Sequence, residues 1–241
     1  YIATPLSLLG PDPENAVAID RRKLRTLAYL LADGSLASMA AVDFVSKDPA
    51  LLDEYVRCLE AFPDVRPVFT PQVHGVTRMS VAKREELSAH YHAPTSLLAW
   101  MRELGLKHPS GSRPGGLRSH EKFIPPFVFE LGREDIAYFL ASLWDCDGYF
   151  GRRLCHYRTI SRQLAEDVQT LLLRLGIRAT IYASSYLRRR GGKAAQQMSY
   201  QVTVYDTAAL ATALQPYMLT AIRRVCWTGH SRPAVARSAF L

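Results

Sequence analysis

Hydrophobic positions recur with helical spacing in two segments that lie far apart in the sequence. Arg22–Ala32 and Arg133–Cys146 each place apolar side chains three and four positions apart. Each segment ends at an Asp-Gly pair, Asp33-Gly34 in the first and Asp147-Gly148 in the second. Such spacing forms one apolar face of an α-helix, and glycine commonly follows the last helical residue. The pattern therefore predicts two helices that end in the same way.

The segments after these two predicted helices also match each other. Short strands are expected within Ser35–Val45 and Tyr149–Ile160, and each is followed by a serine beside a basic residue and a second amphipathic helix. The two Asp-Gly pairs are 114 residues apart, and the two serine-base pairs, Ser46-Lys47 and Ser161-Arg162, are 115 apart. This constant spacing indicates a tandem duplication.

Further strands and a short helix complete each half. The predicted strands are Val65–Val73 and Thr77–Val81 in the first half and Arg178–Tyr186 and Ser199–Tyr205 in the second, and the helices are Ser96–Leu104 and Thr207–Leu214. Between the last two strands, LRRRGGKAAQ predicts a hairpin loop carrying Arg188, Arg189, Arg190 and Lys193. We expect an α+β protein.

A stretch rich in Gly, Pro and Ser, KHPSGSRPGGLRSH, separates the two halves and predicts a linker. We therefore divide the chain into a lead segment (1–20), a first repeat (21–106), a linker (107–121) and a second repeat (122–241).

Composition places the 241-residue chain among globular proteins, because 48% of its residues are hydrophobic and 22% are charged. No apolar run approaches the ~18 residues of a membrane helix, and the opening residues lack a basic leader, so we expect a cytoplasmic protein. The four cysteines lack C-x-x-C spacing, which argues against a zinc ribbon. The first residue is not Met, which suggests processing or a piece of a longer chain.

Positive charge is concentrated in the second half of the chain. Residues 152–241 hold 14 basic and 3 acidic side chains, whereas residues 1–120 hold 14 and 13. Arginine accounts for 24 of the 30 basic residues, and its planar fork suits phosphate oxygens and guanine edges. A polyanion, above all nucleic acid, is therefore the expected partner.

The aspartates at the two helix ends need an explanation beyond helix termination. A carboxylate in the last turn meets the negative end of the helix dipole, at a cost of ~0.3–1 kcal/mol. Small residues spaced four apart, such as Ala28 and Ala32 in the first helix and Ala137 and Ala141 in the second, allow the helices to pack closely. Such packing would bring Asp33 and Asp147 together, where they would repel each other unless a cation lay between them.

Oxygen ligands without a His or Cys partner favour Mg²⁺, with Ca²⁺ or Mn²⁺ as alternatives. The backbone carbonyls of Ala32 and Cys146 would face the same site, because carbonyls at a helix end lack partners within the helix. The alternative reading is that each Asp-Gly pair only ends its helix.

Three segments resemble the LAGLIDADG (dodecapeptide, or DOD-type) homing endonucleases. LASLWDCDG at 140–148 and TLAYLLADG at 26–34 resemble the motif itself, although Leu31 replaces its earlier aspartate. Lys122-Phe123-Ile124-Pro125 resembles the Lys-x-Ile-Pro segment that intein-borne members carry before the second motif. The resemblance covers about residues 20–215 and is to members found in inteins of bacterial replicative helicases. The chain lacks a splicing residue at position 1 and a His-Asn ending, so splicing by this chain is not expected.

The resemblance implies a monomer of two pseudo-symmetric αββαββα repeats, with the motif helices at the interface and antiparallel, saddle-shaped sheets in the DNA major groove. It implies a site-specific endonuclease that makes a Mg²⁺-dependent (or Mn²⁺-dependent) double-strand break in an asymmetric target. Asp33, Asp147 and Lys122 would be catalytic, with Lys122 beside the metal site. A DNA-binding regulator without cleavage activity and an RNA maturase on the same scaffold remain the alternatives.

Several basic residues are candidate DNA contacts. Arg152 and Arg153 are expected on the first strand after the second Asp-Gly pair, and the arginines and lysine of the predicted hairpin loop are expected to contact phosphates or base edges. Lys47 and Arg162, at matching repeat positions, would be either phosphate contacts or supporting catalytic bases.

Overall fold

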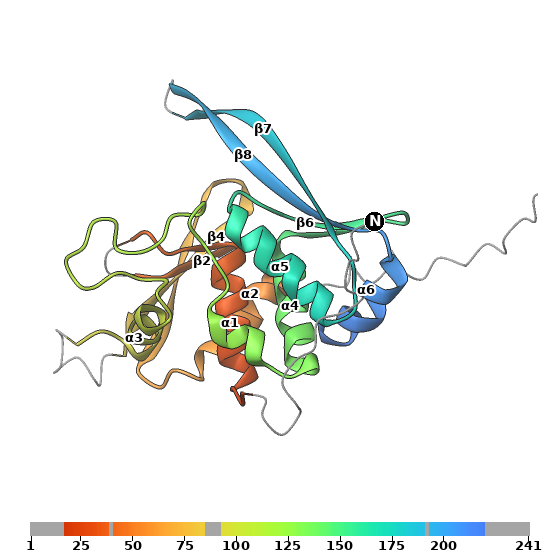
Figure 1. Cartoon of the computed structure of the whole chain (residues 1–241). Coiled ribbons are helices and arrows are strands. Elements are labelled where there is room, and N and C mark those ends of the chain that lie inside the picture. Colours follow the sequence, from red (N-terminus) through yellow and green to blue (C-terminus); the bar gives the residue numbers. More distant parts are fainter. Residues whose placement is uncertain (1–16, 39–40, 85–92, 191–192, 220–241) are drawn as a thin grey trace, which may run out of the picture.

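Two four-stranded antiparallel sheets, one in each half of the chain, have the same strand order in a computed structural model (Figure 1). The structure describes residues 17–38, 41–84, 93–190 and 193–219, and the backbone alone for 188–190 and 193. The first sheet is ordered β1-β2-β4-β3 and the second β5-β6-β8-β7. The predicted α+β fold of two equivalent αββαββα repeats is confirmed.

The elements follow the predicted order in both halves. The first repeat contains α1 (Arg21–Ala32), β1 (Gly34–Ser35), β2 (Asp43–Ser46), α2 (Pro49–Leu59), β3 (Val65–Pro71), β4 (Thr77–Lys83) and α3 (Ser96–Glu103). The second contains α4 (Arg133–Asp147), β5 (Gly148–Phe150), β6 (Cys155–Thr159), α5 (Arg162–Arg174), β7 (Thr180–Arg190), β8 (Lys193–Val204) and α6 (Thr207–Leu214). Short 3₁₀ turns lie at Val73–Gly75, Pro126–Glu130 and Gln215–Tyr217.

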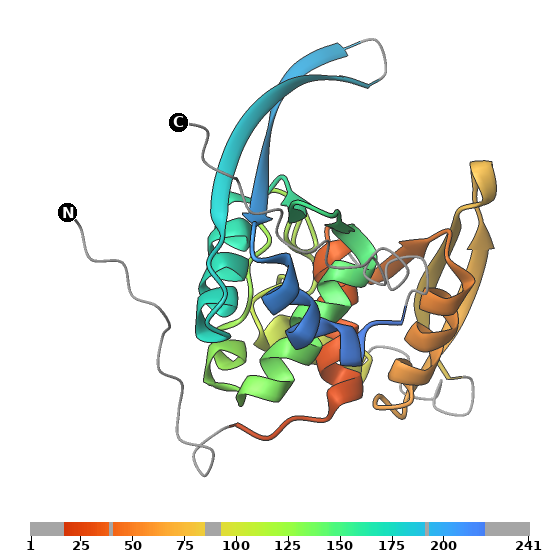
Figure 2. The same ribbon diagram turned by 90° about the vertical axis from the view of Figure 1, so that its right-hand side faces the viewer.

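The two motif helices, α1 and α4, pack against each other at the centre of the molecule. Ala28 and Ala141 are fully buried, so small side chains lie where the helices need to approach closely. Arg25 of α1 joins the halves, since its Nε donates to Ser142 Oγ of α4 at 3.2 Å and its Nη2 to the Tyr217 carbonyl at 3.0 Å. The hairpins β3–β4 and β7–β8 stand on opposite sides of this helix pair (Figure 2).

The β7–β8 hairpin is longer than the sequence pattern predicted and projects beyond the helices (Figure 1). Leu187 pairs with Gln196 and Arg190 pairs with Lys193, so the residues expected to form a loop form strands. The prediction of a loop was wrong because it took the end of the apolar pattern as the end of the strands. The polar residues only mark the point where the hairpin leaves the core. Strand pairing continues past that point, because the backbone hydrogen bonds do not require apolar side chains.

Arg152 and Arg153 lie in the turn between β5 and β6 and not on the first strand, as had been expected. The strand is only three residues long, and Gly151 N donates to the Leu154 carbonyl at 3.0 Å to close the turn. Both arginines are exposed. They therefore stand at the tip of a hairpin and not along its face.

The segment predicted as a linker packs against the end of the first motif. Gly115 N donates to the Ala37 carbonyl at 3.0 Å, and the buried Lys107 ammonium donates to the carbonyls of Leu36 (2.9 Å), Ser38 and Ala41 (3.2 Å). Lys107 thus ties this connection to the loop that follows β1. Within the described ranges, no helix is both long enough and apolar enough to cross a membrane.

Candidate functional site

The central helices deliver both motif aspartates to one end of the helix pair. Asp33 is the C-terminal cap of α1, and Asp147 is the last residue of α4. The carboxylates of both aspartates raise the pKa of the same buried lysine, Lys122, against the lowering effect of its burial. The two acids, one from each repeat, therefore act on one buried cation.

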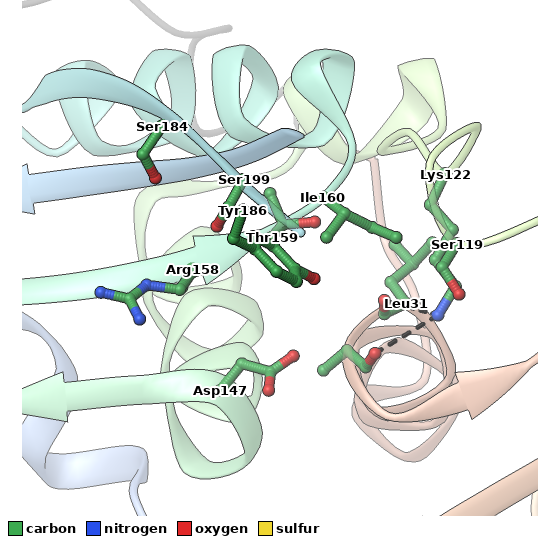
Figure 3. Close-up of a pocket in the computed structure, with 11 residues that line it drawn as sticks. Leu31, Ser119, Lys122, Asp147, Arg158, Thr159, Ile160, Ser184, Tyr186 and Ser199 are labelled. Atoms are coloured by element: carbon green, nitrogen blue, oxygen red, sulfur yellow. Dashed lines mark hydrogen bonds between the residues drawn. The ribbon is translucent and has the colours of Figure 1, made fainter. Parts of the chain in front are cut away.

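A cavity of about 580 Å³ opens beside Asp147 (Figure 3). The ends of both motif helices, the segment before α4 and the sheet of the second repeat all contribute to its walls. Its lining residues are Leu31, Ala32, Ser119, Lys122, Asp147, Arg158, Thr159, Ile160, Ser184, Tyr186 and Ser199. Two catalytic candidates, Asp147 and Lys122, therefore line one cavity together with side chains from the second sheet.

Lys122 caps the C-terminus of α1. Its Nζ donates to the carbonyls of Leu30 (3.0 Å), Leu31 (2.9 Å), Ala32 (3.3 Å) and Gly34 (2.8 Å), and the residue is only 3% exposed (Figure 3). Carbonyls at a helix end lack partners within the helix, and a cation there meets the negative end of the dipole. Burial lowers the pKa of Lys122 to about 8. The lysine thus fixes the helix end that carries Asp33.

Helix α5 holds the backbone around Lys122. Ser161 caps α5 by accepting from Leu164 N (3.2 Å), and its Oγ donates to the Lys122 carbonyl (2.5 Å). Ile124 N donates to Asp167 Oδ2 at 2.8 Å. Ser161, the serine of the Ser161-Arg162 pair, therefore positions Lys122. The sequence pattern did not show this role.

Arg158 of β6 is a cavity residue that the sequence analysis missed. Its Nη2 donates to Gln201 Oε1 at 2.6 Å, and Gln201 Nε2 donates to Thr203 Oγ1 at 3.1 Å. The side chain is exposed and shares the cavity with Asp147. The strand alternation around Tyr157 could have indicated it, because a buried Tyr157 places its neighbour on the opposite face.

The other predicted DNA contacts lie on separate elements, and none of those that the structure describes is among the residues that line the cavity. Lys47 is exposed in the bend between β2 and α2. Arg162 is exposed at the first residue of α5, where its Nε donates to Glu166 at 2.8 Å. The side chains of the four basic residues near the hairpin tip, Arg188, Arg189, Arg190 and Lys193, lie outside the described residues.

The donor atoms at the helix ends suit a hard cation. The predicted donors are the two carboxylates and the carbonyls of Cys146 and Ala32, and the Ala32 carbonyl also accepts from Lys122 Nζ at 3.3 Å. In the described part of the chain, no group of three or more His, Cys, Asp or Glu side chains could enclose a metal ion. A Mg²⁺ ion held by Asp33 and Asp147 would therefore complete its coordination with water or ligand oxygens, as Mg²⁺ usually does.

The sequence is similar to one protein family and to segments of bacterial helicases. Residues 134–214 match the family of LAGLIDADG-like domains. The replicative DNA helicase DnaB of Synechocystis is 29% identical over 218 residues, 87% of this chain and 23% of the helicase. That of Rhodothermus marinus is 32% identical over 191 residues, 75% of this chain and 19% of the helicase. The chain thus spans about a fifth of the length of these relatives.

Solved structures show the same fold. The homing endonuclease I-DmoI in complex with DNA and Mn has a TM-score of 0.52 at 13% identity, over 83% of this chain and 98% of that chain. The N-terminal LAGLIDADG domain of DUF199/WhiA has a TM-score of 0.50 at 10% identity, over 87% and 90%.

The two equivalent repeats, each with an aspartate at the end of its first helix, define a two-repeat α+β protein with the fold of the homing endonuclease I-DmoI. The second repeat matches the LAGLIDADG-like domain family, and most of the chain has the fold of the LAGLIDADG homing endonucleases, as its motifs predicted.

Proposed function

We propose that this protein is a site-specific homing endonuclease that makes a metal-dependent double-strand break in DNA by hydrolysing phosphodiester bonds. The observation that carries the proposal is that Lys122 caps the helix end that carries Asp33 and lines, together with Asp147, a cavity on the face of the second sheet. The solved complex of I-DmoI with DNA and Mn supports a divalent metal and a DNA substrate for this fold.

Each residue of the site has a distinct task in this reaction. Asp33 and Asp147 would hold Mg²⁺, or Mn²⁺ in its place, between the repeats. When bound, Mg²⁺ supplies Lewis acidity toward the phosphodiester and lowers the pKa of a bound water. Lys122 keeps the end of α1 in place and adds positive charge where the phosphate becomes more negative. Arg158 presents guanidinium donors on the sheet side of the cavity.

We propose that one chain acts alone, in the cytoplasm, on an asymmetric target. One copy supplies both aspartates, so the reaction does not need a second copy. The two sheets present different side chains at equivalent positions: Arg158 pairs with Gln201 in the second, whereas Val45 pairs with Arg78 in the first. The two halves of the DNA site would therefore be read differently.

We propose that the target is a replicative helicase gene that lacks this insertion. The similarity to two helicases covers only about a fifth of each, and the chain that matches this fifth has the fold of an endonuclease. An endonuclease segment carried within a host protein fits an intein. Selection of cleaved sites from a plasmid library of randomised targets, compared with the helicase sequence flanking the insertion point, tests this assignment.

The alternatives are a DNA-binding regulator that has lost cleavage and an RNA maturase. The LAGLIDADG domain of WhiA shows that the fold also occurs outside proteins named as endonucleases. Both motif aspartates are present here, which favours the nuclease. Competition between the target duplex and structured RNA separates the maturase, and binding without metal-dependent cleavage identifies the regulator.

DNA affinity is expected to fall steeply with salt, because arginines that contact phosphates displace counterions. The log–log slope should be about −0.9 for each phosphate contact. Fluorescence anisotropy of a labelled duplex between low and high salt measures it. A slope near zero would contradict a DNA interface built on the basic second repeat.

Arg158→Ala is expected to relax sequence preference at one base pair of the second half-site. A guanidinium that forms two hydrogen bonds to a guanine edge contributes ~1–3 kcal/mol of discrimination. Cleavage of a panel with each base pair substituted in turn measures the effect. Arg57→Ala, which changes an exposed side chain of α2, is the control. Uniform weakening at all positions would show that Arg158 contacts only phosphate.

Cleavage and stability should change in opposite directions between pH 7.5 and 9. Burial lowers the pKa values of Lys122 and Lys107 to about 8, below the ~10.4 of an unfolded lysine. The unfolded chain then binds more protons above pH 8, so the free energy of unfolding rises with pH, by at most ~1.4 kcal/mol per unit for each lysine. The single-turnover cleavage rate should fall as Lys122 loses its charge. Urea unfolding and quenched-flow cleavage measure the two trends, and a rate that rises through pH 9 would contradict this role.

A further inference from the structure

A tyrosine hydroxyl lies buried beneath the last turn of α4. Tyr157 of β6 pairs directly with Gly148, the residue after Asp147, and its ring lies against Trp144 with centroids 5.4 Å apart. A Cβ on Gly148 would come within 2.2 Å of the Trp144 side chain, so the glycine makes room for this packing. Tyr157 is therefore fixed between its strand and the helix that carries Asp147.

The hydroxyl of Tyr157 has no hydrogen-bond partner among the described residues, and its side chain is fully buried. Leaving a buried hydroxyl unpaired costs about 1–3 kcal/mol, and a phenylalanine would avoid that cost. The first repeat has a phenylalanine at the equivalent position. Phe44 pairs with Gly34, and its ring stacks on Tyr29 with centroids 5.2 Å apart. The second repeat therefore keeps a polar atom that the equivalent position lacks.

The surroundings of the hydroxyl indicate its use. Besides burial, the groups that raise the pKa of Tyr157 are Asp147, Cys146 and Asp33. The same three groups act on Lys122. The geometry agrees, because Tyr157 pairs with Gly148, the residue after Asp147, and Lys122 donates to the carbonyl of Gly34, the residue after Asp33. A protonated phenol is a hydrogen-bond donor suited to a carboxylate.

We propose that Tyr157 is a positioning residue that donates its hydroxyl hydrogen to the Asp147 carboxylate when the site holds its divalent cation. Residues that hydrogen-bond to metal ligands orient them and raise metal affinity. Only the second repeat has this support, so the two halves of the site hold the cation unequally, and the two DNA strands are cut at different rates. This inference rests on the proposed function.

Tyr157→Phe tests the proposal, and Tyr55→Phe is its matched control. Tyr55 is also fully buried, and its hydroxyl likewise lacks a partner in the part of the chain that the structure describes. Besides burial, the groups that raise its pKa are Cys58 and Asp43. Neither variant should lose thermal stability in the absence of metal, because each removes an unpaired polar atom. A folding defect is thereby separated from a defect at the site.

Two measurements decide the matter. The first is a Ca²⁺ titration of the DNA-bound protein, followed by its melting temperature. The Ca²⁺ concentration that gives half of the full stabilisation should rise about 10-fold in Tyr157→Phe and stay unchanged in Tyr55→Phe. The second is the nicking rate of each strand, measured with a different label on each, where Tyr157→Phe should slow one strand more than the other.

The outcomes separate this proposal from the proposed function. If the wild type responds to Ca²⁺ and cuts DNA, and Tyr157→Phe behaves like Tyr55→Phe in both measurements, the positioning role is wrong and the nuclease assignment stands. If the wild type neither responds to the metal nor cuts, both are wrong. A shifted Ca²⁺ midpoint with an altered strand ratio in Tyr157→Phe alone supports the role.

Discussion

Replacing Asp147 or Asp33 with asparagine is expected to abolish cleavage of both DNA strands, with a loss of about 10³-fold in the single-turnover rate. Asparagine keeps the size of the side chain but removes the negative charge that would hold a divalent cation. The fold should remain, because a charge that opposes the helix dipole is removed from the end of α1 or α4. Quenched-flow cleavage with labelled duplex in Mg²⁺ measures the rate, and binding in Ca²⁺ should stay within a few-fold.

Asp145→Asn is the matched control for these variants. Asp145 lies on the same helix two residues before Asp147 and is almost fully buried, and its Oδ2 accepts from Leu219 N at 3.0 Å. Asparagine can still accept this hydrogen bond, and the first repeat has Leu31 in the equivalent place. Asp145→Asn should therefore cleave within several-fold of wild type. Wild-type cleavage by Asp33→Asn or Asp147→Asn would contradict a shared metal site.

Lys122→Ala is expected to lower cleavage by about 10²-fold or more and also to reduce stability. The variant removes a positive charge beside the acidic pair, and the four carbonyls at the end of α1 lose their common donor. Unpaired buried acceptors cost about 1–3 kcal/mol, which urea unfolding would detect. The dissociation constant for DNA should stay within a few-fold, because the buried ammonium acts mainly on the charge that develops in the transition state.

Lys107→Ala is the control that separates the effect of Lys122 on stability from its effect on cleavage. Lys107 is equally buried and also donates to three backbone carbonyls, but the groups that act on its pKa are Arg102 and Asp43 and not the motif aspartates. It should lose stability and keep its cleavage rate in saturating DNA. If Lys122→Ala recovers its rate once DNA is saturating, or loses no more activity than Lys107→Ala, Lys122 is only structural.

The sequence pattern was sufficient for most of the fold. The helix ends at Asp33 and Asp147 and the order of strands follow from local periodicity and from the agreement between repeats. The extent of the β7–β8 hairpin does not follow, because its outer half pairs through the backbone with little apolar pattern. Local signals thus locate elements well where they contact the core.

Only part of the candidate site could be predicted, because some of its contacts join residues that are far apart in the sequence. The motif aspartates and Lys122 lie in recognisable segments, but the contacts of Lys122 with α1 join residues about 90 positions apart. Arg158 and Tyr157 are adjacent on β6 and face opposite sides, one toward the cavity and one into the core. Their roles depend on which face of the strand is buried, and only the packed structure decides that.

Cleavage of one duplex tests the central claim most directly. The duplex carries the helicase gene sequence as it reads without the insertion, and it is incubated with wild type and with Asp147→Asn, with and without Mg²⁺. We expect wild type to break both strands at one site only when Mg²⁺ is present, and Asp147→Asn to bind the duplex without cutting it. Binding of this duplex by wild type, with neither strand cut in Mg²⁺ or Mn²⁺, would contradict the assignment of this protein as an active endonuclease.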